Sequence, residues 1–143
     1  MTVRTILSLK GRDVATILPQ ATLADAARLL SEKRIGAVVV TGPGQTVAGI
    51  LSERDIVRAL SKHGAGALAQ TVESVMTREV VTCTPEETIP ELMQRMTAGR
   101  FRHVPVVEHG RLSGIVSVGD VVKHRLEEME RESQALKKYI ATA

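Results

Sequence analysis

An internal repeat is the feature that most limits how this chain can fold. At a spacing of 66 residues the two halves match in hydrophobic, proline, threonine and arginine positions: Val14 with Val80, Thr16 with Thr82, Pro19 with Pro85, Thr22 with Thr88, Arg34 with Arg100 and Val38 with Val104. Beyond the loop 41–46 the spacing is 65, and it pairs the following residues: Gly49, Ser52 and Asp55 with Gly114, Ser117 and Asp120. A folded unit tolerates the loss of one residue in a surface loop. The chain is therefore expected to fold as two copies of one unit.

Each copy has the same predicted order of elements. Apolar runs predict strands over 14–17, 37–40 and 47–51 in the first copy, and over 80–83, 103–107 and 112–116 in the second. Thr22 or Thr88 at the N-cap begins one helix of each copy, and Ser52 or Ser117 begins the other. The order is β-α-β-β-α, twice. Short helices over 3–7 and 72–76 precede the copies and are expected to cross between them.

The size of the unit indicates that the two copies pack together. About fifty residues, mostly Val, Leu, Ile and Ala at the apolar positions, bury too little surface to be stable alone. We therefore predict an α/β (α+β) fold of two pseudo-symmetric repeats packed sheet to sheet, with a cleft between them. The predicted divisions are 1–70 and 71–126 for the repeats with their linker helices, and 127–143 for a C-terminal amphipathic helix.

The motif Ser-x-x-Asp closes the second hairpin of each copy, with Ser52 and Asp55 in the first and Ser117 and Asp120 in the second. Its commonest role is a capping box, which implies nothing about ligands. A helix N-terminus is also an anion site. The Asp would repel a phosphate but suits the two hydroxyls of a ribose. The residues alone leave both interpretations open: a helix cap, or a nucleotide site with ribose at Asp and phosphate nearer to Ser.

Composition disfavours several other classes of function. The formal charge of +3 comes from basic residues interleaved with acids, and Phe101 and Tyr139 are the only aromatic residues, so nucleic acid is not an expected partner. The single cysteine, Cys83, lies in an apolar run and is expected to be a buried, inert thiol. His103 has no second histidine at ligand spacing, so no metal site is predicted.

No catalytic residue is predicted either. The sequence has no His-Glu-x-x-His, Gly-x-Ser-x-Gly or Walker motif. An enzyme acting on a nucleotide would need a positioned acid or base, and His103 is the one candidate. The chain shows no leader and no apolar run long enough to span a bilayer, so a cytoplasmic location without membrane contact is expected.

The duplicated unit, its two Ser-x-x-Asp turns and the segments 34–40 and 100–107 that enter the second strands resemble a tandem pair of CBS domains. This cystathionine-β-synthase-type regulatory module covers about residues 1–126. The resemblance implies binding of an adenine nucleotide (AMP, ADP, ATP or a dinucleotide such as NAD(P)) in one or both clefts. The residues that it implies for the nucleotide are Thr16, Ile17, Gly36, Ala37, Ser52, Arg54, Asp55, Thr82, Cys83, Arg100, Arg102, His103, Val104, Pro105, Ser117 and Asp120.

In the roles implied by this resemblance, Asp55 and Asp120 take ribose hydroxyls, the two serines face phosphate or sugar, and the strand entries frame the adenine. The copies differ in charge, because Arg100, Arg102 and His103 stand where the first copy has Arg34, Gly36 and Ala37. The site of Asp120 is therefore expected to bind a nucleotide more strongly than the site of Asp55. The alternative is that Arg54 reaches across the pseudo-symmetric cleft to the phosphate of the second site, so that the two sites share parts. A solvated surface is the alternative for the two arginines.

The C-terminal segment carries an apolar stripe at steps of four and three, formed by Val122, Leu126, Met129, Ser133, Leu136 and Ile140. Such a stripe is typical of a short coiled coil, and a helix folded back on its own domain is the alternative. We expect a homodimer that acts on an unidentified target protein. The alternatives to a nucleotide-binding regulatory module are a structural or oligomerisation adaptor with unoccupied sites and, in third place, a nucleotide-acting enzyme.

Overall fold

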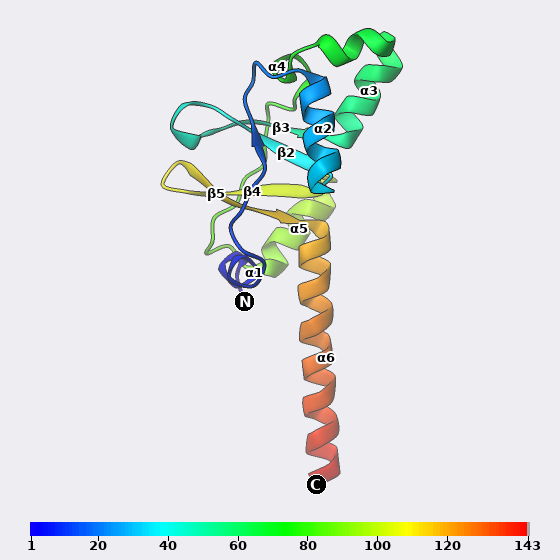
Figure 1. Cartoon of the computed structure of the whole chain (residues 1–143). Helices are drawn as coiled ribbons and strands as arrows, with labels where there is room; N and C mark the ends of the chain where they lie inside the picture. Colours follow the sequence, from blue (N-terminus) through cyan, green and yellow to red (C-terminus); the bar gives the residue numbers. More distant parts are fainter. Residues whose placement is uncertain (143) are drawn as a thin grey trace.

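Two β-hairpins, one from each repeat, lie at the centre of the computed structural model, which describes residues 1–142 (Figure 1). In chain order the elements are α1 (Val3–Lys10), β1 (Thr16–Ile17), α2 (Leu23–Lys33), β2 (Ala37–Thr41), η1 (Pro43–Gln45), β3 (Val47–Ser52), α3 (Glu53–His63), η2 (Gly64–Ala69), α4 (Val72–Val75), α5 (Ile89–Gly99), β4 (His103–Glu108), β5 (Arg111–Ser117) and α6 (Val118–Thr142). Among the helices of residues 1–142, none combines the length and the apolar character needed to cross a bilayer.

The two hairpins are equivalent residue by residue. β2 pairs antiparallel with β3, with Val38 opposite Leu51, and β4 pairs antiparallel with β5, with Val104 opposite Val116. Each ladder has an irregularity at the same place, directly after Val40 in one and the matching valine in the other. In Figure 1 the two sheets lie one above the other with their hairpin turns on the same side. The structure thus confirms the predicted fold of two α+β repeats.

One predicted strand is reduced to a single bridge. In the first repeat β1 runs parallel to β2, and the Val39 N–H donates to the Ala15 carbonyl at 3.2 Å. The residue equivalent to Val39 is Pro105, which has no N–H to donate. The second repeat keeps only an isolated bridge at Cys83, whose N–H donates to the Pro105 carbonyl at 3.0 Å. The prediction of a strand over 80–83 was therefore wrong, and the second sheet has two strands.

The first helix of each repeat begins and ends at equivalent residues. Thr22 begins α2 by accepting a hydrogen bond from the Asp25 N–H at 3.2 Å, and Thr88 begins α5 in the same way. Both helices end at an arginine in the left-handed conformation, Arg34 with φ 54° and Arg100 with φ 56°. These ends aim the chain back into the hairpin, so that residues 34–37 and 100–103 enter the sheets from matching directions.

The short helix before each repeat packs in the core of the other repeat. Leu7 of α1 is buried among residues of the second repeat, whereas Met76, which follows α4, is buried in the first. Each contacts the glycine in the last strand of that repeat's hairpin: a Cβ on Gly114 of β5 would lie 2.7 Å from Leu7 Cδ2, and one on Gly49 of β3 would lie 2.6 Å from Met76 Sδ. The predicted crossing of the linker helices is confirmed, and it explains why glycine occupies the two equivalent positions.

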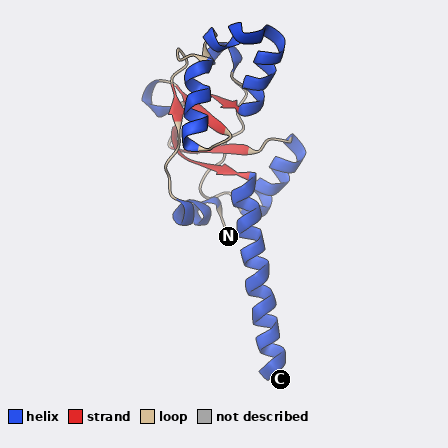
Figure 2. Cartoon of the chain, turned by 45° about the vertical axis from the view of Figure 1, so that its right-hand side comes forward, coloured by secondary structure: helices blue, strands red, loops and turns tan. Residues whose placement is uncertain are grey.

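The helix that follows Ser117 does not end with the repeat. α6 is one helix of 25 residues, and its C-terminal half projects away from the sheets without touching them (Figures 1 and 2). The sequence between Asp120 and Ile140 has no glycine or proline, so nothing breaks the helix at the predicted boundary near residue 126. The alternative of a tail folded back on its own domain is therefore wrong.

Candidate functional site

The first Ser-x-x-Asp turn is a complete capping box. The Ser52 N–H donates to Asp55 Oδ2 at 2.9 Å, the Ser52 hydroxyl donates to the same oxygen at 3.1 Å, and the Asp55 N–H donates to Ser52 Oγ at 3.4 Å. Asp55 is buried, and its second oxygen, Oδ1, lies 3.6 Å from the exposed guanidinium of Arg58. The cap thus uses one carboxylate oxygen and leaves the other facing a weak, solvent-screened partner.

The second turn forms the same cap but carries an additional cation. The Ser117 N–H donates to Asp120 Oδ2 at 2.9 Å, and the Asp120 N–H donates to Ser117 Oγ at 3.1 Å. Lys10, the last residue of α1, donates to the same Asp120 oxygen at 2.6 Å and to the Ile115 carbonyl at 3.0 Å. The crossing of α1 into the second repeat therefore brings an ammonium to Asp120 that Asp55 lacks.

A cleft of about 460 Å³ opens in front of the first turn. Ser52 and Asp55 of the first repeat form one wall, and residues of the second repeat form the opposite wall. The residues that line it are Gly36, Ala37, Ile50, Ser52, Glu53, Arg54, Asp55, Arg58, Thr77, Glu79, Val80, Val81, Arg100, Phe101, Arg102 and His103. We call it the Asp55 cleft. Neither repeat could form it alone.

A second cleft of about 690 Å³ is the pseudo-symmetric counterpart. It is lined by Lys10, Asp13, Val14, Ala15, Lys33, Ile35, Gly36, Ala37, His103, Ile115 and Ser117. We call it the Ser117 cleft, because Ser117 lines it whereas Asp120 does not. Asp120 lines instead a separate hollow of about 290 Å³ between α1 and α6, where Lys10 donates to its carboxylate.

The two clefts exchange parts between the repeats. The Ser-x-x-Asp turn of the first repeat faces Val80 and Val81 of the second, and the turn of the second faces Val14 and Ala15 of the first. Consequently Arg100 and Arg102 lie beside Asp55 rather than beside Asp120. The sequence had assigned their charge to the site of Asp120. The assignment was wrong because Arg100 and Arg102 of the second repeat line the cleft that contains the Ser-x-x-Asp turn of the first.

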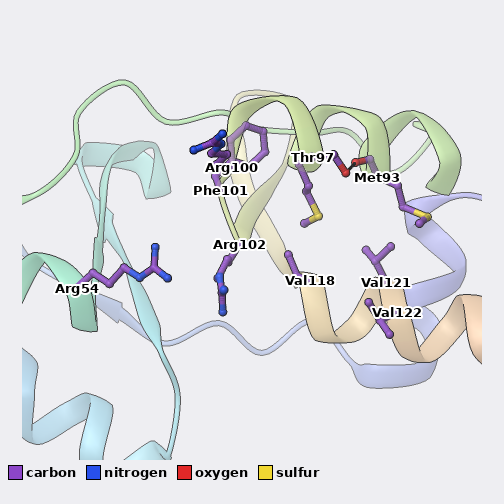
Figure 3. A pocket seen from close by; sticks show the side chains of 10 residues that line it. Arg54, Met93, Thr97, Arg100, Phe101, Arg102, Val118, Val121 and Val122 are labelled. Carbon is purple, nitrogen blue, oxygen red and sulfur yellow. Dashed lines mark hydrogen bonds between the residues drawn. The ribbon is translucent and has the colours of Figure 1, made fainter.

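Three arginines from both repeats meet at one end of the Asp55 cleft. Figure 3 shows Arg54 reaching from α3 toward Arg102, with Arg100 and Phe101 above. All four residues also border a neighbouring groove of about 450 Å³ between α5 and α6. In the described part of the chain, none of the three guanidinium groups makes an ion pair or a side-chain hydrogen bond. This end of the cleft is therefore cationic, while Asp55 lies on its other wall.

His103 lies where the two clefts meet, and it lines both. Burial lowers the pKa of its imidazole, and the nearby charges of Lys10 and Arg102 lower it further, against Asp120 and Glu53. The ring is therefore neutral at neutral pH. It can donate one hydrogen bond and accept another, which suits a polar ligand group in either cleft.

Seven of the residues predicted for the nucleotide do not line either cleft in residues 1–142: Thr16, Ile17, Thr82, Cys83, Val104, Pro105 and Asp120. Near Thr16 and Thr82 the residues that do line the clefts lie two positions earlier in the chain, at Val14 and Val80. Cys83 is in the core, where burial above all raises the pKa of its thiol to about 12, as the prediction of an inert thiol requires. The other nine predicted residues line at least one of the two clefts.

Sequence reasoning missed Lys10, although the chain carried a signal for it. Once the helix over 3–7 was expected to cross to the other repeat, its last turn had to end near that repeat's Ser-x-x-Asp turn. A lysine at that end is therefore placed within reach of Asp120.

The described residues contain no group of three or more His, Cys, Asp or Glu side chains arranged to hold a metal ion.

Fold and clefts together define a duplicated module with two composite clefts, each lined by residues of both repeats. A family model for the CBS domain matches residues 6–62 and 72–127. The chain therefore belongs to the CBS domain family, as a tandem pair.

Curated relatives agree with this assignment. The mitochondrial CBS domain-containing protein CBSX3 of Arabidopsis thaliana is 39% identical over 123 residues, which cover 83% of this chain and 60% of the relative. YhcV of Bacillus subtilis is 35% identical over 114 residues and 79% of each chain. The chain thus spans only part of the length of several relatives, 24% in the case of CBSCBSPB2 of Arabidopsis thaliana.

Solved structures share the fold. The CBS-domain protein ATU1752 from Agrobacterium tumefaciens is 50% identical, with a TM-score of 0.84 over 87% of this chain and 99% of that one. The CBS domain pair of protein MJ0100, solved in complex with 5′-methylthioadenosine and S-adenosyl-L-methionine, is 25% identical, with a TM-score of 0.80 over 90% of this chain and 98% of that one.

Proposed function

We propose that this chain is a regulatory module that binds an adenine nucleotide (AMP, ADP, ATP or NAD(P)) at the clefts between its repeats and performs no catalysis. The observation that carries the proposal is a cleft that has Asp55 on one wall and, at its end, three arginines whose guanidinium groups make no ion pair or side-chain hydrogen bond within residues 1–142. A carboxylate accepts the two hydroxyls of a ribose, and guanidinium groups bind phosphate oxygens in pairs. Adenosine-type ligands in the MJ0100 pair support the same use of the cleft.

The geometry favours one orientation of the nucleotide in the Asp55 cleft. The ribose binds at Asp55 Oδ1, the phosphates extend to Arg54, Arg100 and Arg102, and the base enters between the apolar segments that include Val80 and Val81. In the Ser117 cleft, Lys10 already satisfies the carboxylate that would take the ribose. We therefore propose the Asp55 cleft as the phosphate-binding site, with weaker binding at the Ser117 cleft.

The units of function are proposed as the sequence divides them, at 1–70, 71–126 and 127–143, with a homodimer as the assembled form. A cytoplasmic location stays a prediction, and the relative CBSX3 is described as mitochondrial. The second candidate function, an adaptor with unoccupied clefts, is favoured by the fact that both Ser-x-x-Asp turns form complete helix caps from protein hydrogen bonds alone.

Titration calorimetry with ATP, AMP and 5′-methylthioadenosine separates these candidates. We expect ATP to bind more tightly than the uncharged nucleoside, and Arg100→Ala with Arg102→Ala to remove that preference. Arg111→Ala is the control, because this exposed arginine lies outside both clefts. Saturation at a hundred times Kd should raise the free energy of unfolding by about 2.7 kcal/mol. No heat of binding and no thermal shift with any of the three compounds or NAD(P) would favour the adaptor.

A further inference from the structure

An apolar stripe on α6 is largely exposed to solvent. Its large side chains are well exposed: Val122 46%, Leu126 61%, Met129 51%, Leu136 60% and Ile140 65%. Ser133 continues the stripe between Met129 and Leu136, and it is exposed as well. These six residues, called the α6 seam, occupy alternating steps of four and three along the helix, the spacing of a and d positions in a coiled coil.

The α6 seam is separate from the side of the helix that packs on the domain. Val121 and His124 are only 2% and 3% exposed, and they face the second repeat. At 100° per residue, this side lies about 130° around the axis from the seam. A partner could therefore cover the seam without displacing the contacts of α6 with its own domain.

A helix of this kind is not expected to stand alone in water. The part of α6 beyond residue 126 is about 16 residues long and has no contact with the sheets, and this length is close to the limit of about 12 to 15 residues below which isolated helices are marginal in water. Helical stability in proteins comes mainly from packing of an apolar face. The long α6 thus indicates a partner along the seam.

We propose that the partner is α6 of a second copy of this chain, packed parallel as a two-stranded coiled coil. With Leu126, Ser133 and Ile140 at a positions, the flanking g positions are Arg125 and Glu132 and the e positions are Glu130 and Lys137. In a parallel pair each g residue faces the e residue five positions later on the other helix. Arg125 then meets Glu130 of the second copy, and Glu132 meets its Lys137.

These charges match on both sides of the pair. By the two-fold symmetry there are four opposite-charge contacts and no like-charge contact among these positions. Within one chain Arg125 already contacts Glu128 at 3.2 Å, so the contact with Glu130 of the second copy would be shared with that pair. The proposal deepens the homodimer part of the proposed function and does not depend on nucleotide binding.

Antiparallel packing fits the same helix less well. If the full seam is aligned antiparallel, Lys123 lies opposite Lys137 of the second copy, and Glu130 lies opposite Glu130 of the second copy. Both contacts bring like charges together and are repulsive. A shift of the second helix by one heptad toward the repeats brings opposite charges together. It also places Leu136 opposite Gly119, and Ile140 then lies beyond the start of α6 and has no partner. The parallel pair is the arrangement that satisfies both the apolar side chains and the charges.

The seam is continuous with the groove between α5 and α6. Val122 belongs to both, and Val118 and Met93 extend the apolar lining toward Arg102 (Figure 3). A parallel pair brings this groove of each copy to the same end of the assembly. The cationic ends of both Asp55 clefts would then lie near the dimer axis, where a bound nucleotide could affect the contact between copies.

Sedimentation equilibrium of the full chain and two aspartate variants tests the seam. The wild type is expected at twice 15.4 kDa, and Leu136→Asp at the mass of one chain at the same micromolar concentration. Gln134→Asp, which changes the residue next to Ser133 and outside the seam, should remain a dimer. Ser133→Ile should lower the dimer dissociation constant by at least about tenfold, because it replaces a polar a-position residue. A monomeric wild type or a dimeric Leu136→Asp would overturn the proposal.

Charge exchange tests the partner positions. Glu132→Lys should raise the dimer dissociation constant by about threefold to tenfold, because two attractive contacts become repulsive. The double variant Glu132→Lys with Lys137→Glu should restore it. These residues are five apart on one helix and do not face each other within a chain, so only contact between copies explains a rescue. Lack of rescue would exclude the parallel register.

A cysteine placed near the end of α6 distinguishes the two orientations. In a Cys83→Ala background, Ile140→Cys should form a disulfide between copies on mild oxidation, because equal a positions face each other in a parallel pair. In the full-seam antiparallel pair the two cysteines would be about 27 Å apart, at 1.5 Å per residue. Calorimetry on the same variants measures nucleotide binding separately. A variant that is monomeric but still binds the nucleotide would leave the proposed nucleotide binding at the clefts unaffected.

Discussion

Asp55 combines two roles that sequence motifs usually present as alternatives. Its Oδ2 atom closes the capping box of α3, while Oδ1 faces a cleft that the other repeat completes with arginines. The cap holds the carboxylate in one orientation without using up its acceptor capacity. A helix cap is therefore a way to preorganise a ligand contact, and the two roles can be separated by comparison with a cap outside the clefts.

Asp55→Ala should weaken binding of ATP by about tenfold to a hundredfold, because hydrogen bonds to a charged acceptor contribute about 1.5 to 3 kcal/mol. It should also lower the free energy of unfolding by about 1 kcal/mol through loss of the cap. Asp25→Ala is the matched control, since Asp25 closes the capping box of α2 at Thr22 but lies outside both clefts. Calorimetry should show unchanged affinity for that variant. If Asp55→Ala and Asp25→Ala bound ATP with equal affinity, Asp55 would act only as a helix cap.

Lys10 should control how stability depends on pH. Burial acts to raise the pKa of the Asp120 carboxyl, but hydrogen bonds from Lys10 and Ser117 and the charge of Lys10 outweigh it, and the pKa lies below its ordinary 3.8. A depressed carboxyl pKa adds stability above the ordinary value, and this is lost as pH falls through the folded value.

In Lys10→Met burial remains and the ammonium is gone, so the pKa of Asp120 rises. The variant should be less stable than wild type by about 1 kcal/mol at neutral pH. The difference should narrow as pH falls below about 3.8, where the carboxylate is protonated in the unfolded chain. Thermal unfolding followed from neutral to acidic pH measures this. Lys123→Met is the control, because it removes an exposed lysine of α6 one turn after Asp120. If the difference in stability between Lys10→Met and wild type stayed constant with pH, Lys10 would act by packing alone.

At the scale of elements, the repeat made most of the fold predictable, and local chemistry decided the exceptions. Equivalent apolar runs, caps and turns predicted both hairpins and four of the longer helices. Pro105 removed one strand by lacking an N–H, which periodicity does not register. The sequence allowed for shared parts through Arg54 but did not predict Arg100 and Arg102 beside Asp55, because matching positions in two copies do not say whether a Ser-x-x-Asp turn faces the strand of its own repeat or of the other.

The equivalent glycines of β3 and β5 should differ in their tolerance of alanine. In Gly49→Ala the new Cβ would meet the backbone carbonyl of Thr77 at 2.8 Å as well as Met76, whereas in Gly114→Ala it would meet only the side chain of Leu7. A side chain can change rotamer, but a paired backbone cannot move easily. Overpacking costs about 1 to 3 kcal/mol, and we expect Gly49→Ala at the upper end and Gly114→Ala at the lower. Chemical denaturation of both variants measures the difference, and a greater loss in Gly114→Ala would contradict it.

At the scale of the whole molecule, the crossing helices make each half incomplete. The second core contains Val3, Ile6 and Leu7 of α1, and the first contains Val72 and Met76 from the far side of residue 70. Loss of a buried side chain of this size costs about 2 to 5 kcal/mol, a large part of the stability of a small domain. The two repeats therefore depend on each other through these helices as well as through the clefts.

Separate fragments 1–70 and 71–143 should each lack a cooperative thermal transition, and an equimolar mixture should recover one, because mixing returns each helix to the core that it completes. The source of the recovery can be assigned with two variants of the first fragment. Leu7→Asp places a charge in the second core, where Leu7 is 1% exposed, and should prevent recovery. Leu9→Asp alters the same helix at a position that is 70% exposed and should leave recovery intact. Circular dichroism and size-exclusion chromatography follow both mixtures. A fragment 71–143 that melts cooperatively by itself would show that α1 rests on the second repeat without completing its core.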